Sequence, residues 1–547
     1  ENRELGRLPA LSDRKWMQKH SKLGGTTAES SSQSRRYFFL EFLCQIGWYH
    51  DILSSLLEGR FFMPQNKTII CGRSFVMSVS LAILILYIVA LFAISWFAKK
   101  RSEGTTENYA LAGRKLNAPL IGVSIIGLAV GGASTIGVSE HAFKVGLSAG
   151  WYTAAWGIGA IIMGMFLAEK YRKANITTVS ELIERHHDSK AVVLGVICQI
   201  IIQLVIISLQ YIAGGSIISA IMPEIGFKTG VMISAVTFIG ITFIGGMWSA
   251  SLSNILNIIL IYAGIAIATV IQFTKVGGLS GLGMNLPANI PWFDPVAGVG
   301  IKGIMSWIVV LVTVNLSLQS IIQISLGAKD AATARKGFVW GGILMIPVGF
   351  MSALLGICAK AAYPTANAAL ALPQAIVELQ PLLAGLTLAA LWAADVSTAC
   401  NLLLSAGTLF SKDIYKRYIN PACDESKQLS VMRWSVVISG VLTVGMAMMV
   451  SGILNTIMMG LSLTAAFSII VIVALFFPQY ACKAAGFNTM LVGLVLLIAW
   501  QLVPAIRIFP HVIYMEWVAC IITYVVTAIV APEKKALPAV CPEEEIA

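Results

Sequence analysis

LIGVSIIGLAVGGASTIGVSEHAFKVG, residues 120–146, is the stretch on which the interpretation of the whole chain depends. It is long and apolar enough to cross a bilayer, whose hydrocarbon core takes about 20 residues of helix. Four glycines interrupt it within eleven residues: Gly127, Gly131, Gly132 and Gly137. A glycine inside a helix costs about 1 kcal/mol relative to alanine, so the pattern predicts a membrane helix that unwinds.

Unwound backbone at membrane depth leaves amide and carbonyl groups without partners, which is tolerated only inside protein or beside a water-filled cavity. Broken helices of this kind coordinate small cations and polar solutes near the middle of the bilayer. We therefore interpret residues 120–146 as half of a site for an ion and a solute. The alternative is a face of small residues at which two helices pack closely.

The composition of the chain is that of a polytopic membrane protein. Of its 547 residues 57% are hydrophobic and only 12% are charged, whereas soluble domains carry about 25% charged residues. The net charge of +11 does not indicate nucleic acid as a partner, because the basic residues lie mainly in short loops between apolar runs. The nine cysteines form no CxxC pair and no Cys/His cluster, so neither a disulfide framework nor a zinc site is expected.

Apolar runs of membrane-spanning length predict an all-α fold with about thirteen transmembrane helices. The predicted spans are residues 77–97, 120–140, 151–167, 191–222, 231–247, 252–273, 301–326, 337–361, 382–410, 434–450, 454–477, 490–503 and 512–530. Lys and Arg residues in alternate loops divide 21 to 6. Cytoplasmic loops carry the excess of positive charge, so residue 77 is expected outside the cell and the C-terminus in the cytoplasm. The membrane is expected to be the plasma membrane, which is the inner membrane of a bacterial cell.

The domain organisation follows from these spans. Residues 1–76 are polar and are expected to be a disordered extension or a translation upstream of a native start at Met77. Residues 77–531 are the predicted membrane domain, and residues 532–547 form a cytoplasmic tail. The partners expected from composition are the lipid bilayer and a small organic solute, with no obligate protein partner.

A second informative stretch is AALWAADVSTACNLLLSAGTLFSKDIY, residues 389–415. Ala394, Ser397 and Thr398 follow at i, i+3 and i+4 and so share one helix face. Two hydroxyl oxygens with neighbouring carbonyls make an oxygen-only environment without formal charge, which suits a monovalent cation better than Ca²⁺. The alternative is that both hydroxyls bond back to the preceding helical turn.

Three motifs resemble those of the solute:sodium symporter family. AADVSTACNLLLSAGTLFSKDIYK, beginning at Ala393, resembles the family's ninth-helix signature. STIGVSEHAFKVGLSAG, beginning at Ser134, is similar to its second-helix pattern, and QISLGAKDAATARKG, beginning at Gln323, is similar to its cytoplasmic loop. The resemblance implies a leucine-transporter-type fold with two inverted repeats of five helices, at residues 120–273 and 301–477. One leading helix, residues 77–98, and two trailing helices, residues 488–531, would complete it.

The resemblance also implies a sodium site, with Na+ as the coupling ion. Its ligands would be the carbonyl oxygens of Gly127 and Val130 in the second helix and of Ala394 in the ninth. The hydroxyls of Ser397 and Thr398 would complete the set. The family's TDxxQ in the sixth helix, which serves a second sodium in some members, is SNILN here, with Asn254 and Asn257. We therefore expect one sodium ion per solute.

Residues that could contact the solute come from the same reasoning. The resemblance places Gly131 and Ser134 on the solute side of the broken helix. Gln203, Gln210, Asn315 and Gln319 lie within predicted spans where they can face a central cavity, although interhelical hydrogen bonds would also explain them. Tyr152 is more typical of an interfacial aromatic belt. No buried Arg or Lys is available to pair with a solute carboxylate, which favours a zwitterion or another small organic solute held by helix-end dipoles.

Asp395 is the unusual residue of the ninth helix. A carboxylate in the middle of a membrane costs about 2.5 to 3.5 kcal/mol on insertion scales and usually has a function. Being next to the predicted sodium ligands, Asp395 could tune ion affinity or carry a proton. A protonated Asp395 bonded to a neighbouring helix is the equally weighted alternative.

The sequence thus predicts a sodium-coupled secondary active symporter that imports a small organic solute by alternating access. A proton-coupled symporter using Asp395 and a sensor or receptor on the same fold are the alternatives. An enzyme is not expected, since the spans contain no carboxylate pair, His cluster or nucleophile with a neighbouring base.

Overall fold

The computed structural model describes residues 68–448 and 453–534. The chain divides into two compact units, Glu1–Gly72 and Arg73–Ala547, and all described helices except the first turn of the leading one lie in the second unit. Residues 1–67 of the predicted extension and residues 535–547 of the predicted tail lie outside the described residues. The leading helix begins at Thr68, nine residues before Met77.

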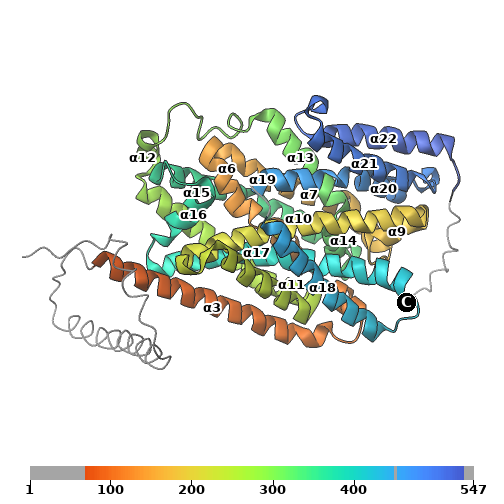
Figure 1. Cartoon of the computed structure of the whole chain (residues 1–547), viewed down its shortest axis with the longest axis horizontal. Helices are drawn as coiled ribbons and strands as arrows, with labels where there is room; N and C mark the ends of the chain where they lie inside the picture. The colour runs from red at the N-terminus through yellow and green to blue at the C-terminus, as the bar shows by residue number, and fades with distance from the viewer. Residues whose placement is uncertain (1–67, 449–452, 535–547) are drawn as a thin grey trace, which may run out of the picture. The chain divides into compact units, whose positions relative to one another are not determined.

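The described residues are helical, apart from loops and an isolated bridge between Leu116 and Ala328. Figure 1 shows the long helices of Arg73–Ala547 running side by side. The first ten helices are α3 (Thr68–Ser102), α4 (Thr106–Leu111), α5 (Ala118–Ala129), α6 (Val138–Val145), α7 (Trp151–Ile162), α8 (Ala168–Lys173), α9 (Val179–His186), α10 (Ser189–Ile221), α11 (Gly226–Lys275) and α12 (Gly278–Asn285).

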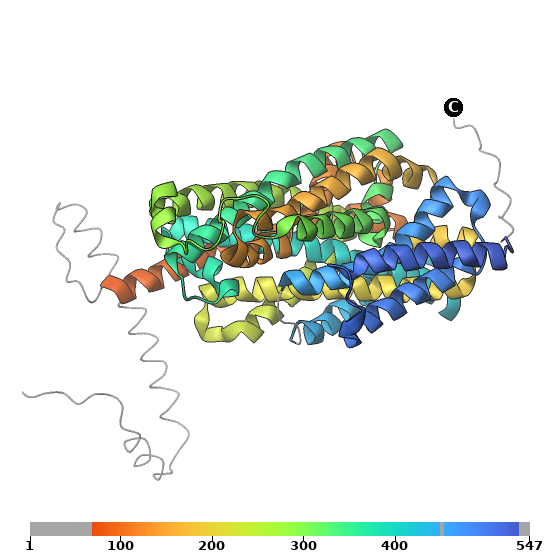
Figure 2. The same cartoon turned by 90° about the horizontal axis from the view of Figure 1, so that it is seen from above.

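The second half of the chain is also helical, and the view from above in Figure 2 shows its helices packed among those of the first half. These helices are α13 (Gly300–Ser317), α14 (Gln319–Leu326), α15 (Ala331–Ala362), α16 (Ala368–Val377), α17 (Pro381–Leu409), α18 (Glu425–Ala447), α19 (Ile453–Ser462), α20 (Thr464–Phe476), α21 (Ala485–Leu502) and α22 (Val512–Val530). Three π-helical segments interrupt or extend them: η2 (Ala133–Gly137), η4 (Met163–Leu167) and η6 (Phe410–Ile419).

Eleven described helices are long and apolar enough to cross a membrane, and a bent pair makes a twelfth crossing. Two of the thirteen predicted spans fall within α11. A straight helix of its 50 residues would be about 75 Å long at 1.5 Å per residue, more than twice the hydrocarbon core of a bilayer. It bends instead at Gly246, whose φ of 50° and ψ of −138° are not helical.

The bent pair is the predicted broken helix. Residues Ala118–Ala129 and Ala133–Val145 meet at an angle of 59°. The corresponding helix of the second half is also interrupted, because Leu318, with φ −72° and ψ 127°, separates α13 from α14. A broken first helix in each half is the signature of transporter folds built from two repeats. The predicted repeat organisation therefore has a structural counterpart in both halves.

Two residues of the motif beginning at Gln323 have structural roles. Asp330 begins α15 by accepting a hydrogen bond from the Thr333 backbone N–H at 2.7 Å, and this bond lowers the pKa of Asp330. Gln323 Nε2 donates to Ala110 O at 2.7 Å and to Thr408 Oγ1 at 3.1 Å. Its side chain therefore links α14 to α4 and to α17.

Gly246→Ala tests the fold at the bend of α11. A Cβ there would overlap the Tyr109 carbonyl oxygen and ring, and the backbone conformation alone costs roughly 1 to 3 kcal/mol for a residue other than glycine. We expect a clear drop in the thermal unfolding midpoint of the purified protein. Gly445→Ala is the matched control, because a Cβ added to that helical glycine would have no other atom within 4 Å; equal midpoints for the two variants would contradict the assignment.

Candidate functional site

The backbone between α5 and α6 unwinds where the glycines occur. Val130 leaves the helix with φ −89° and ψ 67°, and the π-helical segment η2 begins at Ala133. The Gly131 carbonyl accepts the amides of Ser134 and Thr135 at 2.9 and 3.1 Å. The break thus leaves a carbonyl end at α5 and an amide end at η2.

Glycine is required at this break because two other helices approach the backbone. A Cβ on Gly131 would overlap Thr398 Oγ1 and Gln210 Oε1. A Cβ on Gly132 would overlap Asp395 Oδ1 and the side chain of Ala213. The small residues therefore let α17 and α10 bring polar atoms directly against the unwound backbone.

The hydroxyl pair of α17 lies at the carbonyl end of the break. Thr398 Oγ1 is 3.0 Å from both the Gly127 and the Leu128 carbonyl oxygens, to which its hydrogen can be donated. Ser397 Oγ donates to the Ala394 carbonyl at 2.8 Å. Both hydroxyls are buried, with exposed fractions of 1% for Ser397 and 3% for Thr398. Two helices far apart in sequence therefore bring carbonyl and hydroxyl oxygens together inside the bundle.

The five residues predicted to bind sodium are joined only in part by these contacts. The structure connects Thr398 to Gly127 and Ser397 to Ala394. Val130 is fully buried at the break, and its N–H donates to the Ile126 carbonyl at 2.7 Å. The second carbonyl near Thr398 is that of Leu128, which the family resemblance does not indicate.

An asparagine pair lies behind the carbonyl end. A Cβ on Gly127 would overlap the Asn254 side-chain amide, so this amide packs directly on the glycine. Asn257 Nδ2 donates to Asn254 Oδ1 at 3.2 Å, and Tyr87 Oη of the leading helix α3 donates to Asn257 Oδ1 at 2.7 Å. The SNILN departure from the family motif thus builds a neutral polar chain that connects α3 to the broken helix.

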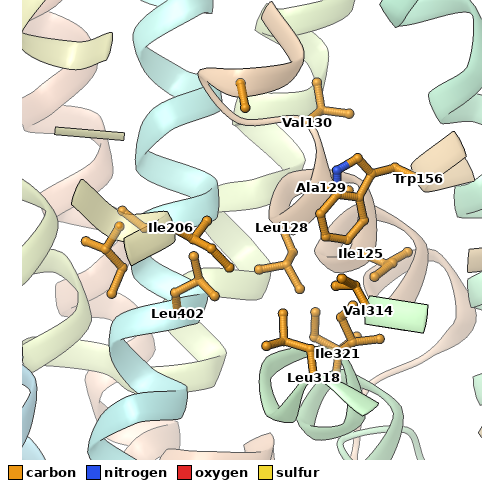
Figure 3. Close-up of a cluster of buried hydrophobic side chains, with 14 of the residues drawn as sticks. Ile125, Leu128, Ala129, Val130, Trp156, Ile206, Val314, Leu318, Ile321 and Leu402 are labelled. Atoms are coloured by element: carbon orange, nitrogen blue, oxygen red, sulfur yellow. The ribbon is translucent and has the colours of Figure 1, made fainter. Parts of the chain in front are cut away.

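A small cavity of about 10 Å³ lies beside the break and is bounded in part by Gly131 and Thr398. Its volume is close to the minimum that holds one water molecule, so the site is almost closed in this conformation. The lining residues are Leu128, Ala129, Gly131, Ala133, Tyr152, Trp156, Ile206, Gln210, Leu318, Thr398, Leu402 and Ile457. Figure 3 shows six of them, with Trp156 and Leu402 on opposite sides of the turn that carries Leu128 and Ala129.

Of the predicted solute contacts, only Gly131 and Gln210 line this cavity. Ser134 Oγ donates to Ala129 O at 2.8 Å. The amides of Gln203 and Asn315 donate to Gln199 O and Leu311 O, each one turn earlier in the same helix. Gln319 Oε1 accepts the Val179 amide at 2.7 Å and so ties α14 to α9. Helical periodicity placed these polar residues within the bundle but could not tell which cavity or helix each one faces.

Gln210, which the sequence placed where it could face a central cavity, does line it, whereas Tyr152 and Trp156 were not assigned to the cavity from sequence. Gln210 Oε1 accepts the Gly132 N–H at 2.7 Å. Tyr152 and Trp156, one turn apart on α7, are buried rather than part of an interfacial aromatic belt. Tyr152 Oη and Trp156 Nε1 have no hydrogen-bond partner of normal geometry among the described residues. The i, i+4 spacing of the two aromatics within an apolar span was the available signal.

Asp395 lies at the amide end of the break. It is fully buried, and its Oδ1 packs so closely against Gly132 that no side chain fits there. Within the described residues neither carboxylate oxygen accepts a hydrogen bond of normal geometry. Asp395 is not among the residues that line the cavity, whereas Gly131, Ala133 and Gln210 are.

A group of charged residues connects α9 with η6, the π-helical end of α17. Lys412 Nζ is 2.5 Å from Glu181 Oε1, and Arg417 pairs with Glu184. Thr178 Oγ1 donates to Asp413 Oδ1 at 3.0 Å. These contacts join α9 to the end of α17.

Comparison with known proteins identifies the fold. The structure matches that of a Na+-coupled sialic acid symporter, solved in a substrate-bound outward-open state, with a TM-score of 0.71 and 18% identity over 84% of this chain and 99% of that one. It also matches Mhp1, a nucleobase-cation-symport-1 family transporter, with a TM-score of 0.57 and 13% identity over 77% and 95% of the two chains. The predicted leucine-transporter-type fold is confirmed.

Proteins similar in sequence to this chain include several sodium-coupled transporters. A sodium/glucose cotransporter 4 of Danio rerio is 27% identical over 64% of this chain, and the match spans 60% of that protein's length. A sodium/glucose cotransporter of Vibrio parahaemolyticus is 24% identical over 70% of this chain and 76% of its own. The sodium/pantothenate symporter of Escherichia coli is 26% identical over 61% and 71%.

Residues 109–493 match the sodium:solute symporter family. The matched region includes both broken helices, the hydroxyl pair of α17 and the motif beginning at Gln323. The chain therefore belongs to the sodium:solute symporter family.

Proposed function

We propose that the protein imports a small organic solute together with Na+ by alternating access. The observation that carries this proposal is the approach of Thr398 Oγ1 to two carbonyl oxygens at the end of α5. A dehydrated alkali cation needs several neutral oxygens at one point, and family membership makes Na+ the ion to expect there.

The proposed ion ligands are the carbonyls of Gly127, Val130 and Ala394 and the hydroxyls of Ser397 and Thr398. A cation among these oxygens would bridge α17 to the broken helix and fix the unwound backbone. Since the cavity is lined by residues from the same break, ordering the backbone also orders one wall of the solute site. The two ligands would then bind cooperatively, because the first one reduces the conformational freedom that the second must remove.

The driving force follows from the charge that crosses the membrane. One sodium ion gains about 2.3 kcal/mol per 100 mV of membrane potential, to which its concentration gradient adds. This energy is used only if ion and solute bind one conformation more tightly than the other. In the proposed orientation, with α6 outside, the contacts between α9 and η6 would keep the cytoplasmic side closed and must separate during each cycle.

Sodium dependence is the first prediction. Uptake of the transported solute into vesicles should fall to the background when external Na+ is replaced by choline at constant ionic strength, because choline is too large for a site built from two helices in contact. The measurement is the initial rate of radiolabelled solute uptake at zero and physiological Na+. Equal rates in the two media would reject the proposal, and uptake driven by a pH gradient alone would point to proton coupling.

Thr398→Val is the second prediction, directed at the ion site. The substitution keeps the shape of the side chain and removes one oxygen, so the Na+ concentration for half-maximal uptake should rise by roughly tenfold, the effect of losing about 1.4 kcal/mol. Ser397→Ala should act in the same direction, and Thr398→Ser should restore most of the affinity. Thr443→Val in α18 is the control, since Thr443 is also buried but donates to its own helix, at Ser439 O, instead of to the broken helix; an equal loss of sodium affinity in this variant would contradict the assignment.

Opening at the cytoplasmic side gives the third prediction. Replacing Glu181 and Glu184 together by Gln removes both ion pairs to η6, and partly exposed pairs contribute about 0.2 to 1 kcal/mol each. A cysteine introduced at the buried Ser320 should then react roughly threefold faster with a membrane-impermeant reagent applied from the cytoplasmic side.

Glu169→Gln is the matched control for this experiment, because its ion pair with Lys173 lies within one exposed helix. It should leave the labelling rate at Ser320 unchanged. A double variant that labels no faster than this control would mean that the α9 contacts do not hold the closed state.

A further inference from the structure

The two ends of the broken helix are contacted by one face of α17. Thr398 lies at the carbonyl end, against Gly127 and Leu128. Asp395, three residues earlier on the same helix face, lies at the amide end, against Gly132. A helix end carries partial charge, negative at its carbonyls and positive at its amides. Each end is therefore met by a group of suitable polarity from the protein itself.

The amide end belongs to a substantial helix, which runs from Ala133 to Val145 through η2 and α6. In transporters with broken helices this end is where an anionic group of the solute binds, for the same reason that phosphates bind at helix N-termini. In this chain two side-chain acceptor oxygens already lie at this amide end. Gln210 Oε1 takes the Gly132 N–H at 2.7 Å, and Asp395 Oδ1 packs on the same residue.

We propose that Asp395 takes the position of a solute carboxylate and that the transported solute therefore carries none. This inference rests on the proposed function and defines its substrate class: a neutral or cationic solute with hydrogen-bond acceptors, rather than an acid or a zwitterion. An ionised Asp395 repels a second carboxylate, and an un-ionised one still fills the space next to Gly132. Asp395 is on this account a specificity-determining residue.

The cavity agrees with that class of solute. None of the lining residues is Lys or Arg, so nothing there neutralises a carboxylate. Trp156 Nε1 can only donate a hydrogen bond, and neither it nor Tyr152 Oη has a hydrogen-bond partner of normal geometry among the described residues. These groups suit hydroxyl or carbonyl oxygens of a solute, and the faces of the two rings suit its apolar or cationic parts.

Matched pairs of compounds test the proposal while the solute itself is unidentified. The pairs differ only at the carboxylate: proline and prolinamide, glucuronate and glucose, pantothenate and panthenol. The readout is the thermal unfolding midpoint of the purified full-length protein in Na+. Any pair that raises the midpoint is expected to do so through the member without the carboxylate. Stronger stabilisation by an acidic member would overturn the proposal.

Asp395→Asn separates charge from shape at this position. For a pair that binds, the preference for the uncharged member over the acid should fall by roughly tenfold, as expected for removing a like charge at short range in protein. Glu516→Gln is the matched control, because Glu516 on α22 is also fully buried but accepts a hydrogen bond from Ser462 and does not contact the broken helix at Gly132. An equal change in the Glu516 variant would contradict the assignment, and an unchanged preference in the Asp395 variant would assign the selectivity to the space that Asp395 fills instead of to its charge.

A second measurement needs no solute. Asp395→Ala leaves the amide end of η2 without its carboxylate, so sodium formate should raise the unfolding midpoint of this variant by roughly 2 °C or more over sodium gluconate, whose anion is too large to enter. The unsubstituted protein should show no such difference. Equal responses of the two proteins would overturn the proposal. None of these outcomes depends on sodium coupling. If the protein were not sodium-coupled, the uptake experiment would show it, because uptake would then be insensitive to Na+.

Discussion

The contact of Thr398 Oγ1 with the Gly127 and Leu128 carbonyls is the interaction on which the rest of this structure depends. It exists only because Gly131 lacks a side chain, which would otherwise occupy the position of the hydroxyl. Because α5 ends at Ala129, the carbonyls of Gly127 and Leu128 lie in its last turn, where intrahelical partners are missing. The absence of a side chain at Gly131 therefore allows both the candidate ion site and one wall of the cavity to form.

Much of the fold was accessible from the sequence because its causes are local. The glycines of residues 120–146 predicted the break, and the apolar runs predicted the crossings, including the two that α11 joins at Gly246. The approach of α17 to the break followed from the family resemblance, and the structure brings Thr398 to Gly127. Whether these residues bind sodium stays a prediction that the structure supports by geometry.

The solute contacts were harder to predict, for a physical reason. A polar side chain within a membrane helix can face a cavity, a neighbouring helix or its own preceding turn, and periodicity does not distinguish these. Gln319 binds the backbone at Val179 instead of facing the cavity, whereas Gln210 faces both the cavity and Gly132. Tyr152 resembles a belt residue in sequence, yet it is enclosed, because α15 packs over the start of α7.

The central claim is that a sodium ion sits between the end of α5 and the hydroxyl pair of α17. The most direct measurement is anomalous diffraction from crystals in which Tl+ replaces Na+. The account predicts a peak within coordination distance of Thr398 Oγ1 and the Gly127 carbonyl oxygen, which disappears when excess Na+ is restored. A sodium-sensitive peak elsewhere in the bundle, with none at Thr398, would contradict it.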